Sequence, residues 1–201
     1  MSKKIIIIDY GMGNLYSVQN ALKAIGAEPV VTSDAAVIAR AEKILLPGVG
    51  AFGDCMANLE KSGLIPVIRE CLASGKPFLG ICLGMQLLFE GSDEAPGVPG
   101  LGFFKGQVKY LPTQLKVPHM GWNKLELRSP SPLLAGAAGE YVYFVHSYHA
   151  EPADKSIITS VCDYGAELTA SVGRENVQAF QFHPEKSSRV GMKLLKNFME
   201  M

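Results

Sequence analysis

The chain has 201 residues, of which 48% are hydrophobic and 19% charged, and Lys+Arg balance Asp+Glu at 19 each. This length and composition predict one domain over residues 1–201 with a substantial core. The balanced charge argues against a nucleic-acid or membrane-surface partner, and four cysteines without a C-x-x-C pair indicate neither a zinc site nor a redox motif.

The first predicted element is a strand at residues 5–8, a β-branched run of the kind that is covered on both faces of a sheet. The run is too short for a signal peptide or a membrane span, so we expect a cytoplasmic protein with reduced thiols. A glycine-rich turn at residues 9–14 leads into a helix from Leu15 that Gly26 ends. The turn lacks the third glycine of a dinucleotide-binding motif, which favours a plain strand-to-helix turn.

Strands and helices then alternate as far as residue 90. The predicted strands cover residues 29–31, 44–46 (stopped by PGVG at 47–50) and 77–82. The predicted helices cover residues 35–41 (capped by Ser33 or Asp34), 52–60, 66–73 and 83–90. This alternation predicts an α/β fold with a central, mostly parallel sheet and helices on both faces.

The second half has a different texture. Residues 91–102 form a loop, and short predicted strands follow at residues 106–110, 125–127, 141–148, 157–163, 167–172 and 177–182. Turn residues separate them, among them Pro118, Gly121, Pro152 and Gly165. This half is therefore expected to be an antiparallel β extension, and an amphipathic helix at residues 189–201 closes the chain.

The strongest chemical signal is the G-x-C-x-G motif at residues 80–84. It is the cysteine version of the nucleophile elbow, a tight strand-to-helix turn with the reactive atom at its tip. Gly80 and Gly84 are expected because the chain crosses itself there, and the helix N-terminus favours the thiolate. We predict Cys82 as the nucleophile and the other three cysteines as core residues.

A nucleophilic cysteine needs a base. His183 lies at the end of the predicted strand at 177–182, and an extended backbone would place Glu185 on the same side, where it can orient the imidazole. His119, His146 and His149 have no evident acid partner, so a structural role or a substrate contact is expected for them. The oxyanion hole is expected to use the N–H of Leu83 and the PGVG turn.

Three motifs in this order, PGVG at 47–50, GICLGMQLL at 80–88 and FHPEKS at 182–187, resemble those of class I (triad-type) glutamine amidotransferases. The resemblance implies a single flavodoxin-like domain that hydrolyses the side-chain amide of glutamine through a cysteine thioester, without a cofactor or metal. It assigns Cys82 as nucleophile, His183 as general base and acid, and Glu185 as the orienting acid. It further implies an oxyanion hole at Val49, Gly50 and Leu83 and glutamine contacts at Gln86, Ser147 and Tyr148.

A narrower resemblance rests on IDYGMGNLYSV at 8–18, HMGWN at 119–123 and YFVHSY at 143–148. These motifs are similar to those in glutaminase subunits of imidazole glycerol phosphate synthases. The likeness implies a heterodimer with a (β/α)8-barrel cyclase subunit, which receives the ammonia and makes imidazole glycerol phosphate in histidine biosynthesis. Asn14, Trp122, Tyr143 and Lys186 fall in motifs that resemble interface positions.

Three alternatives stay open from the residues. The chain could serve another ammonia-using synthase, it could be a non-catalytic regulatory relative, or it could be a self-sufficient cysteine hydrolase. The HMGWN and IDYGMGN motifs argue against the first, and a complete set of Cys82, His183 and Glu185 argues against the second. The third would waste glutamine, because no attached domain would use the ammonia. From the residues alone, Trp122 is equally well a core residue or an interface anchor.

Overall fold

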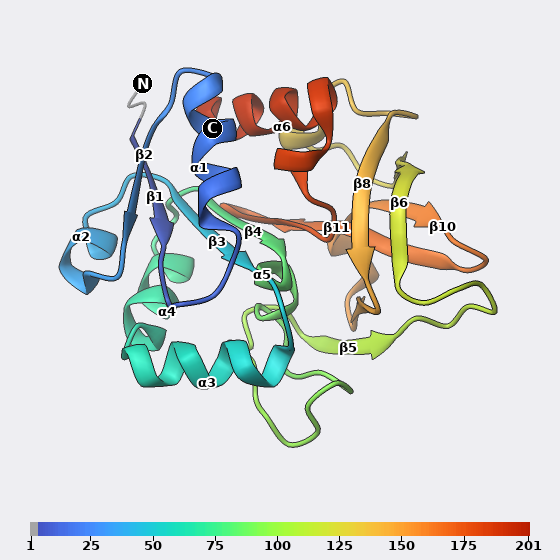
Figure 1. The fold of residues 1–201 in the computed structure, drawn as a ribbon, viewed down its shortest axis with the longest axis horizontal. Helices are drawn as coiled ribbons and strands as arrows, with labels where there is room; N and C mark the ends of the chain where they lie inside the picture. Colours follow the sequence, from blue (N-terminus) through green and yellow to red (C-terminus); the bar gives the residue numbers. More distant parts are fainter. Residues whose placement is uncertain (1–3) are drawn as a thin grey trace.

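A computed structural model describes residues 4–201, and its centre is an eight-stranded sheet (Figure 1). Five strands run parallel in the order β2 (Glu28–Thr32), β1 (Lys4–Ile8), β3 (Ile44–Gly48), β4 (Phe78–Cys82) and β12 (Val177–Phe180). Three antiparallel strands follow, β11 (Glu167–Arg174), β10 (Ile158–Asp163) and β7 (Glu126–Leu127). The mostly parallel sheet with an antiparallel extension is therefore confirmed.

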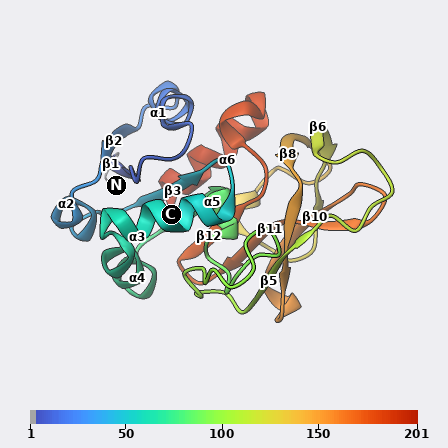
Figure 2. The same ribbon diagram turned by 60° about the horizontal axis from the view of Figure 1, so that its bottom comes forward.

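Helices cover both faces of the sheet (Figures 1 and 2). The helices are α1 (Leu15–Ala24), α2 (Ala35–Ala39), α3 (Phe52–Ser62), α4 (Ile65–Ala73) and α6 (Ser188–Glu200). Side chains alternate along β1, so Ile5 and Ile7 pack in one core with α1 and α6, whereas Ile6 and Ile8 pack in the other with α2, α3 and α4. The run of isoleucines is buried because both faces are covered.

Two further strand pairs lie beside the sheet: β5 (Gly106–Tyr110) with β9 (Tyr148–Pro152), and β6 (His119–Lys124) with β8 (Tyr141–His146). Figure 1 shows β6 and β8 at the end of the molecule away from β2. Three short 3₁₀ turns, Pro132–Leu134, Lys155–Ile157 and Pro184–Lys186, connect elements of this half. Among the helices of residues 4–201, none combines the length and apolar character that a membrane crossing requires.

The predicted helix at residues 83–90 is wrong in length, because α5 (Leu83–Gln86) makes only about one turn. The carbonyls of Leu87, Leu88 and Phe89 instead accept hydrogen bonds from the N–H groups of Leu101, Phe104 and Gly102. Residues 101–104, at the end of the predicted loop and just beyond it, thus donate to the carbonyls that a longer helix would have used. All three residues remain fully buried, which explains their apolar character.

The second half also differs in detail from the expectation. The predicted turn at Gly121 is wrong, because strand β6 runs through this residue (φ +129°) and was not predicted. The run at 141–148 belongs to two strands, because β8 ends at His146 and β9 begins at Tyr148, with Ser147 between them. Pro152 is the last residue of β9 rather than a separator. Short strands with turn residues inside them cannot be bounded from periodicity alone.

Candidate active site

Cys82 ends β4 and immediately precedes α5, with the strained backbone angles of an elbow (φ 55°, ψ −112°). A Cβ added to Gly84 would collide with the carbonyl of Leu46 on β3, and one added to Gly80 would lie 2.9 Å from the carbonyl oxygen of Gly84. These close approaches are the physical reason for both glycines, as the sequence predicted. The turn holds Cys82 beside the end of β3, where it pairs with Gly48.

His183 follows β12, the strand next to β4, so the parallel strand ends bring it to Cys82. Its Nδ1 donates to Oε1 of Glu185 at 2.8 Å, and side-chain exposures of 3% and 1% shield the pair from water. The expected extended backbone is wrong for Glu185, which lies in a 3₁₀ turn. The turn still returns the carboxylate to the imidazole, because Ser187 closes it by donating to the His183 carbonyl at 2.6 Å.

The electrostatics of this group favour an imidazolium. Burial alone would lower the pKa of His183, but its hydrogen bonds with Cys82 and Glu185 outweigh burial and raise that pKa. Since Nδ1 is engaged with Glu185, Nε2 is the nitrogen left for the cysteine. The arrangement can hold a proton between a thiolate and an imidazole and deliver it to a leaving group.

The PGVG segment lies against the elbow. Strand β3 extends two residues further than predicted, through Gly48, before the turn at Val49 and Gly50 (φ +99°). Two side chains hold its carbonyls: Tyr10 Oη donates to the Pro47 carbonyl at 2.9 Å, and Cys55 Sγ contacts that of Val49 at 3.5 Å. Burial is the main cause of the raised pKa of both Tyr10 and Cys55, so each keeps its proton for donation.

A cavity of about 440 Å³ opens over Cys82. The predicted site residues that line it are Val49, Gly50, Cys82, Leu83, Gln86, Ser147, Tyr148, His183 and Lys186. Glu185 is not in its lining, because it lies buried behind His183. As the first residue of α5, Leu83 has no partner for its N–H within the helix, so this donor is free to face a ligand. The cavity thus joins a nucleophile, an acid–base group and a main-chain donor.

Sequence reasoning missed four residues of this region: Glu94, Pro118 and Val145 line the cavity, and Gln181 contacts Cys82. His146, for which a structural role or a substrate contact was expected, also lines the cavity. Glu94 comes from the loop after α5 and accepts from the Phe52 N–H at 2.8 Å. Glu94 and Pro118 lie in loop segments without a recognisable period, and Val145 is an ordinary apolar residue of the predicted strand at 141–148, so none of the three carried a usable signal. Gln181 carried one, because it is a polar residue inside an apolar run.

The four predicted interface residues do not gather in the cavity. Trp122 on β6 is 51% exposed, its ring centroid is 6.1 Å from that of Tyr143 on β8, and Lys186 Nζ lies 5.8 Å from the Tyr143 ring centroid. Only Lys186 also lines the cavity. Asn14 caps α1, accepting from the Ser17 N–H at 3.4 Å.

The chain is similar to known proteins in sequence and in fold. The family model for "Glutamine amidotransferase class-I" matches residues 6–201. The chain is similar to a solved structure described as PurLQS from Thermotoga maritima, with 21% identity, a TM-score of 0.76 and coverage of 100% of this chain and 99% of that one. A crystal structure described as a glutamine amidotransferase has 19% identity, a TM-score of 0.77 and 97% coverage of both chains. At these identities the likeness concerns the fold.

Curated sequences have much higher sequence identity to this chain than these solved structures do. "Imidazole glycerol phosphate synthase subunit HisH" of Aquifex aeolicus is 53% identical over 96% of this chain and 94% of its own length. The protein of the same name from Methanothermobacter thermautotrophicus is 51% identical over 98% of both chains. The fold, the matched domain and these identities agree: the chain belongs to the class I glutamine amidotransferases and, within them, to the family of imidazole glycerol phosphate synthase subunits HisH.

Proposed function

We propose that this chain, as one glutamine amidotransferase domain over residues 1–201, hydrolyses glutamine to glutamate and ammonia. The observation that carries the proposal is the Cys82–His183–Glu185 group at one edge of a cavity, with the acid–base pair shielded from water. The Cys82 thiolate attacks the side-chain carbonyl carbon of glutamine, and the carbonyl oxygen becomes an oxyanion. His183 gives its proton to the leaving nitrogen, ammonia departs, and a thioester remains.

The second half of the reaction uses the same residues. Neutral His183 takes a proton from water, and the resulting hydroxide attacks the thioester carbon. The thiolate departs while His183 keeps the proton, so the thiolate–imidazolium pair is restored and the product acid ionises to glutamate. Glu185 holds Nδ1 protonated, so Nε2 makes every transfer. The N–H groups of Leu83 and of the Val49–Gly50 turn are the proposed oxyanion donors, and Gln86, Ser147 and Tyr148 the proposed contacts for glutamine.

The ammonia is proposed to pass to a partner. The two sequence relatives quoted above are named as synthase subunits, so we propose that this chain works in an imidazole glycerol phosphate synthase. In that assembly a cytoplasmic heterodimer forms with a (β/α)8-barrel cyclase subunit. Trp122, Tyr143 and Lys186 form a continuous aromatic and cationic cluster, which suits a docking surface, with Asn14 as a further contact.

Regulation is expected at the PGVG segment. Two glycines flank the Val49 peptides and permit their rotation, so the donor can be aimed into or out of the cavity. We expect low glutaminase activity from the isolated chain and strong stimulation by the barrel partner with its nucleotide ligand. High, unregulated turnover by the chain alone would contradict this regulation and favour a self-sufficient hydrolase.

The deciding experiment measures glutamate release with and without the partner, and synthesis by the pair from glutamine or from ammonium salts. Cys82→Ala is expected to abolish glutamine hydrolysis and glutamine-dependent synthesis while leaving ammonium-dependent synthesis. Cys71→Ala, which changes a buried cysteine outside the cavity, is the matched control and should keep both activities. Recovery of a different synthase in a pull-down from the source cell would overturn the choice of partner, and loss of both activities in Cys82→Ala would make Cys82 structural.

A further inference from the structure

Gln181 is a buried polar residue to which the proposed reaction assigns no task. It lies between β12 and His183 with no exposed surface, flanked by Phe180 and Phe182. An amide buried among aromatic rings is costly unless its polar atoms have partners. Its partners are two residues of the site: Gln181 Oε1 is 3.0 Å from Gln86 Nε2, and Gln181 Nε2 is 3.8 Å from Cys82 Sγ.

The hydrogen bonds settle the orientation of both amides. Gln86 Nε2 also donates to the carbonyl of Tyr148 at 3.0 Å, and a carbonyl can only accept, so the atom facing Tyr148 is the nitrogen of Gln86. Gln181 must then offer its oxygen to Gln86, which leaves its own N–H groups on the side of Cys82. Both N–H groups of Gln86 are used inward, so the group that it offers to a ligand in the cavity is its oxygen.

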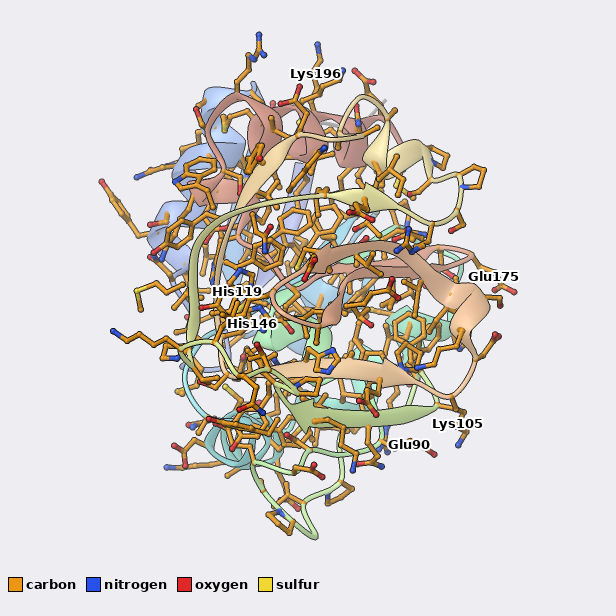
Figure 3. All side chains as sticks on the ribbon, turned by 90° about the vertical axis from the view of Figure 1, so that its right-hand side faces the viewer. Glu90, Lys105, His119, His146, Glu175 and Lys196 are labelled. Atoms are coloured by element: carbon orange, nitrogen blue, oxygen red, sulfur yellow. The ribbon has the colours of Figure 1, made fainter. Side chains whose placement is uncertain are left out.

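The Tyr148 carbonyl is itself held from behind. His146 Nδ1 donates to it at 2.8 Å, His119 Nδ1 lies 3.0 Å from His146 Nε2, and Asn123 Nδ2 lies 3.3 Å from His119 Nε2. Figure 3 shows His119 and His146 side by side. Because Nδ1 of His146 carries the proton, its Nε2 accepts from His119, and Nε2 of His119 accepts from Asn123. Each donor in this series of hydrogen bonds therefore has one acceptor, and the series fixes the position of the Tyr148 carbonyl.

We propose that Gln181 is a positioning residue that locks the Gln86 amide with its oxygen toward glutamine and directs an N–H at the Cys82 thiolate. The inference deepens the proposed function and rests on it for the two amide roles. The locked oxygen is an acceptor, so Gln86 recognises a donor such as the ammonium group or amide N–H of glutamine rather than its carboxylate. The N–H at the sulfur stabilises the thiolate, since hydrogen bonds to charged groups are the stronger ones.

Two variants separate these tasks. Gln181→Glu keeps the side-chain size and the oxygen that accepts from Gln86, but it places a carboxylate oxygen where the native N–H faces Cys82. Gln181→Met removes both polar atoms. The first measurement is the rate of Cys82 alkylation by iodoacetamide at pH 7 in the isolated chain, with the modified peptide identified by mass spectrometry. Both variants should react at least about tenfold more slowly than the native chain, the loss expected for a hydrogen bond to a charged group. Gln178→Glu, two positions before Phe180 on β12 and bonded to the Glu175 carbonyl, is the control and should react at the native rate.

The second measurement is steady-state glutaminase activity with the partner. Gln181→Met should raise KM and lower kcat, whereas Gln181→Glu should lower kcat and keep KM within about threefold of the native value, because Gln86 stays locked. Native alkylation rates in folded Gln181→Met, or the same KM change in both variants, would overturn the proposal. Circular dichroism identifies a variant that fails to fold, and the other variant then decides. The alkylation assay needs no glutamine, so it separates failure of this inference from failure of the proposed function.

Discussion

Two groups of buried histidines lie at the same end of the molecule and have opposite electrostatics. His183 has a carboxylate at 2.8 Å, and its pKa is raised by contacts that outweigh burial. His119 and His146 contact each other and otherwise only neutral groups, and burial lowers their pKa values to about 4 and about 3. All three side chains are almost fully buried. Burial lowers the pKa of all three histidines, so the contrast comes from their contacts: Cys82 and Glu185 raise the pKa of His183, whereas His119 and His146 have no comparable charged partner.

The two groups of histidines therefore have different roles in this region. The charged group can move a proton, which is what acid–base catalysis requires. The neutral pair cannot release a proton near pH 7, but it can fix a carbonyl without placing a second positive charge near the thiolate. The His119 ring stacks on Tyr164 and Phe144 at centroid distances of 4.0 and 4.7 Å, and the burial of this ring is what lowers its pKa. Histidine thus transfers protons at position 183 and fixes the position of a carbonyl at positions 119 and 146.

The largest expected effect comes from removing the negative charge of the first group. Glu185→Gln should lower kcat/KM for glutamine by on the order of 100-fold or more, because the imidazolium loses its stabilising partner and the tautomer is no longer fixed. The measurement is steady-state glutaminase activity of the partnered enzyme. The matched control is Glu151→Gln, which removes an exposed carboxylate 3.7 Å from His149 and should change kcat/KM by less than about threefold. Equal losses in both variants would mean that Glu185 acts on the fold alone.

The second effect is a difference in the sign of pH dependence. His119 and His146 have lowered pKa values, so the unfolded state binds their protons first and stability falls as the pH drops below about 6.5. At pH 5 the loss is about 2 kcal/mol per histidine, from about 1.5 pH units at about 1.4 kcal/mol each. The raised pKa of His183 acts oppositely: its contribution is complete below about pH 6.5 and is lost as the pH rises through the raised value.

Nuclear magnetic resonance of the imidazole nitrogens checks this second prediction directly. His119 and His146 should stay neutral at pH 5 with the proton on Nδ1, and His183 should stay protonated at pH 7.5. Urea unfolding at pH 7 and pH 5 measures the cost, and replacing His119 and His146 together by Gln should reduce the difference between the two pH values. Titration of His119 or His146 between pH 6 and 7 would contradict the assignment.

The first group was accessible from the sequence and the second was not. The glycines around Cys82 and the spacing of His183 and Glu185 have local steric and chemical reasons, and alternation of strands and helices placed both motifs at one sheet edge. Even there, the extended backbone assumed for Glu185 was wrong, and a 3₁₀ turn made the contact instead. The local motif predicted the contact between His183 and Glu185, although the backbone between them is not extended as expected.

The neutral pair depends on contacts that no local pattern indicates. His119 and His146 are 27 residues apart and meet because β6 pairs with β8 in antiparallel register, His119 opposite His146. The sequence hid β6 because Gly121 and Pro118 indicated turns, so the register could not be anticipated. The same reason explains why Gln181 went unassigned: its partners Gln86 and Cys82 lie 95 and 99 residues away along the chain.

The smallest expected effect comes from giving His119 a carboxylate neighbour, like the one that His183 has in Glu185. Asn123 is the neighbour of His119 Nε2 at 3.3 Å, in the place that a carboxylate would need to occupy to resemble Glu185 beside His183. Asn123→Asp should raise the pKa of His119 by about 1 to 3 units, because a nearby negative charge favours the imidazolium. Asn123→Ala, which removes the neighbour without adding charge, should leave His119 neutral at pH 5 and cost about 1 kcal/mol for the lost hydrogen bonds. The measurement is the imidazole titration of both variants by nuclear magnetic resonance. If His119 titrates in Asn123→Asp as it does in the native chain, then burial and stacking, rather than the partner atom, set the charge of this histidine.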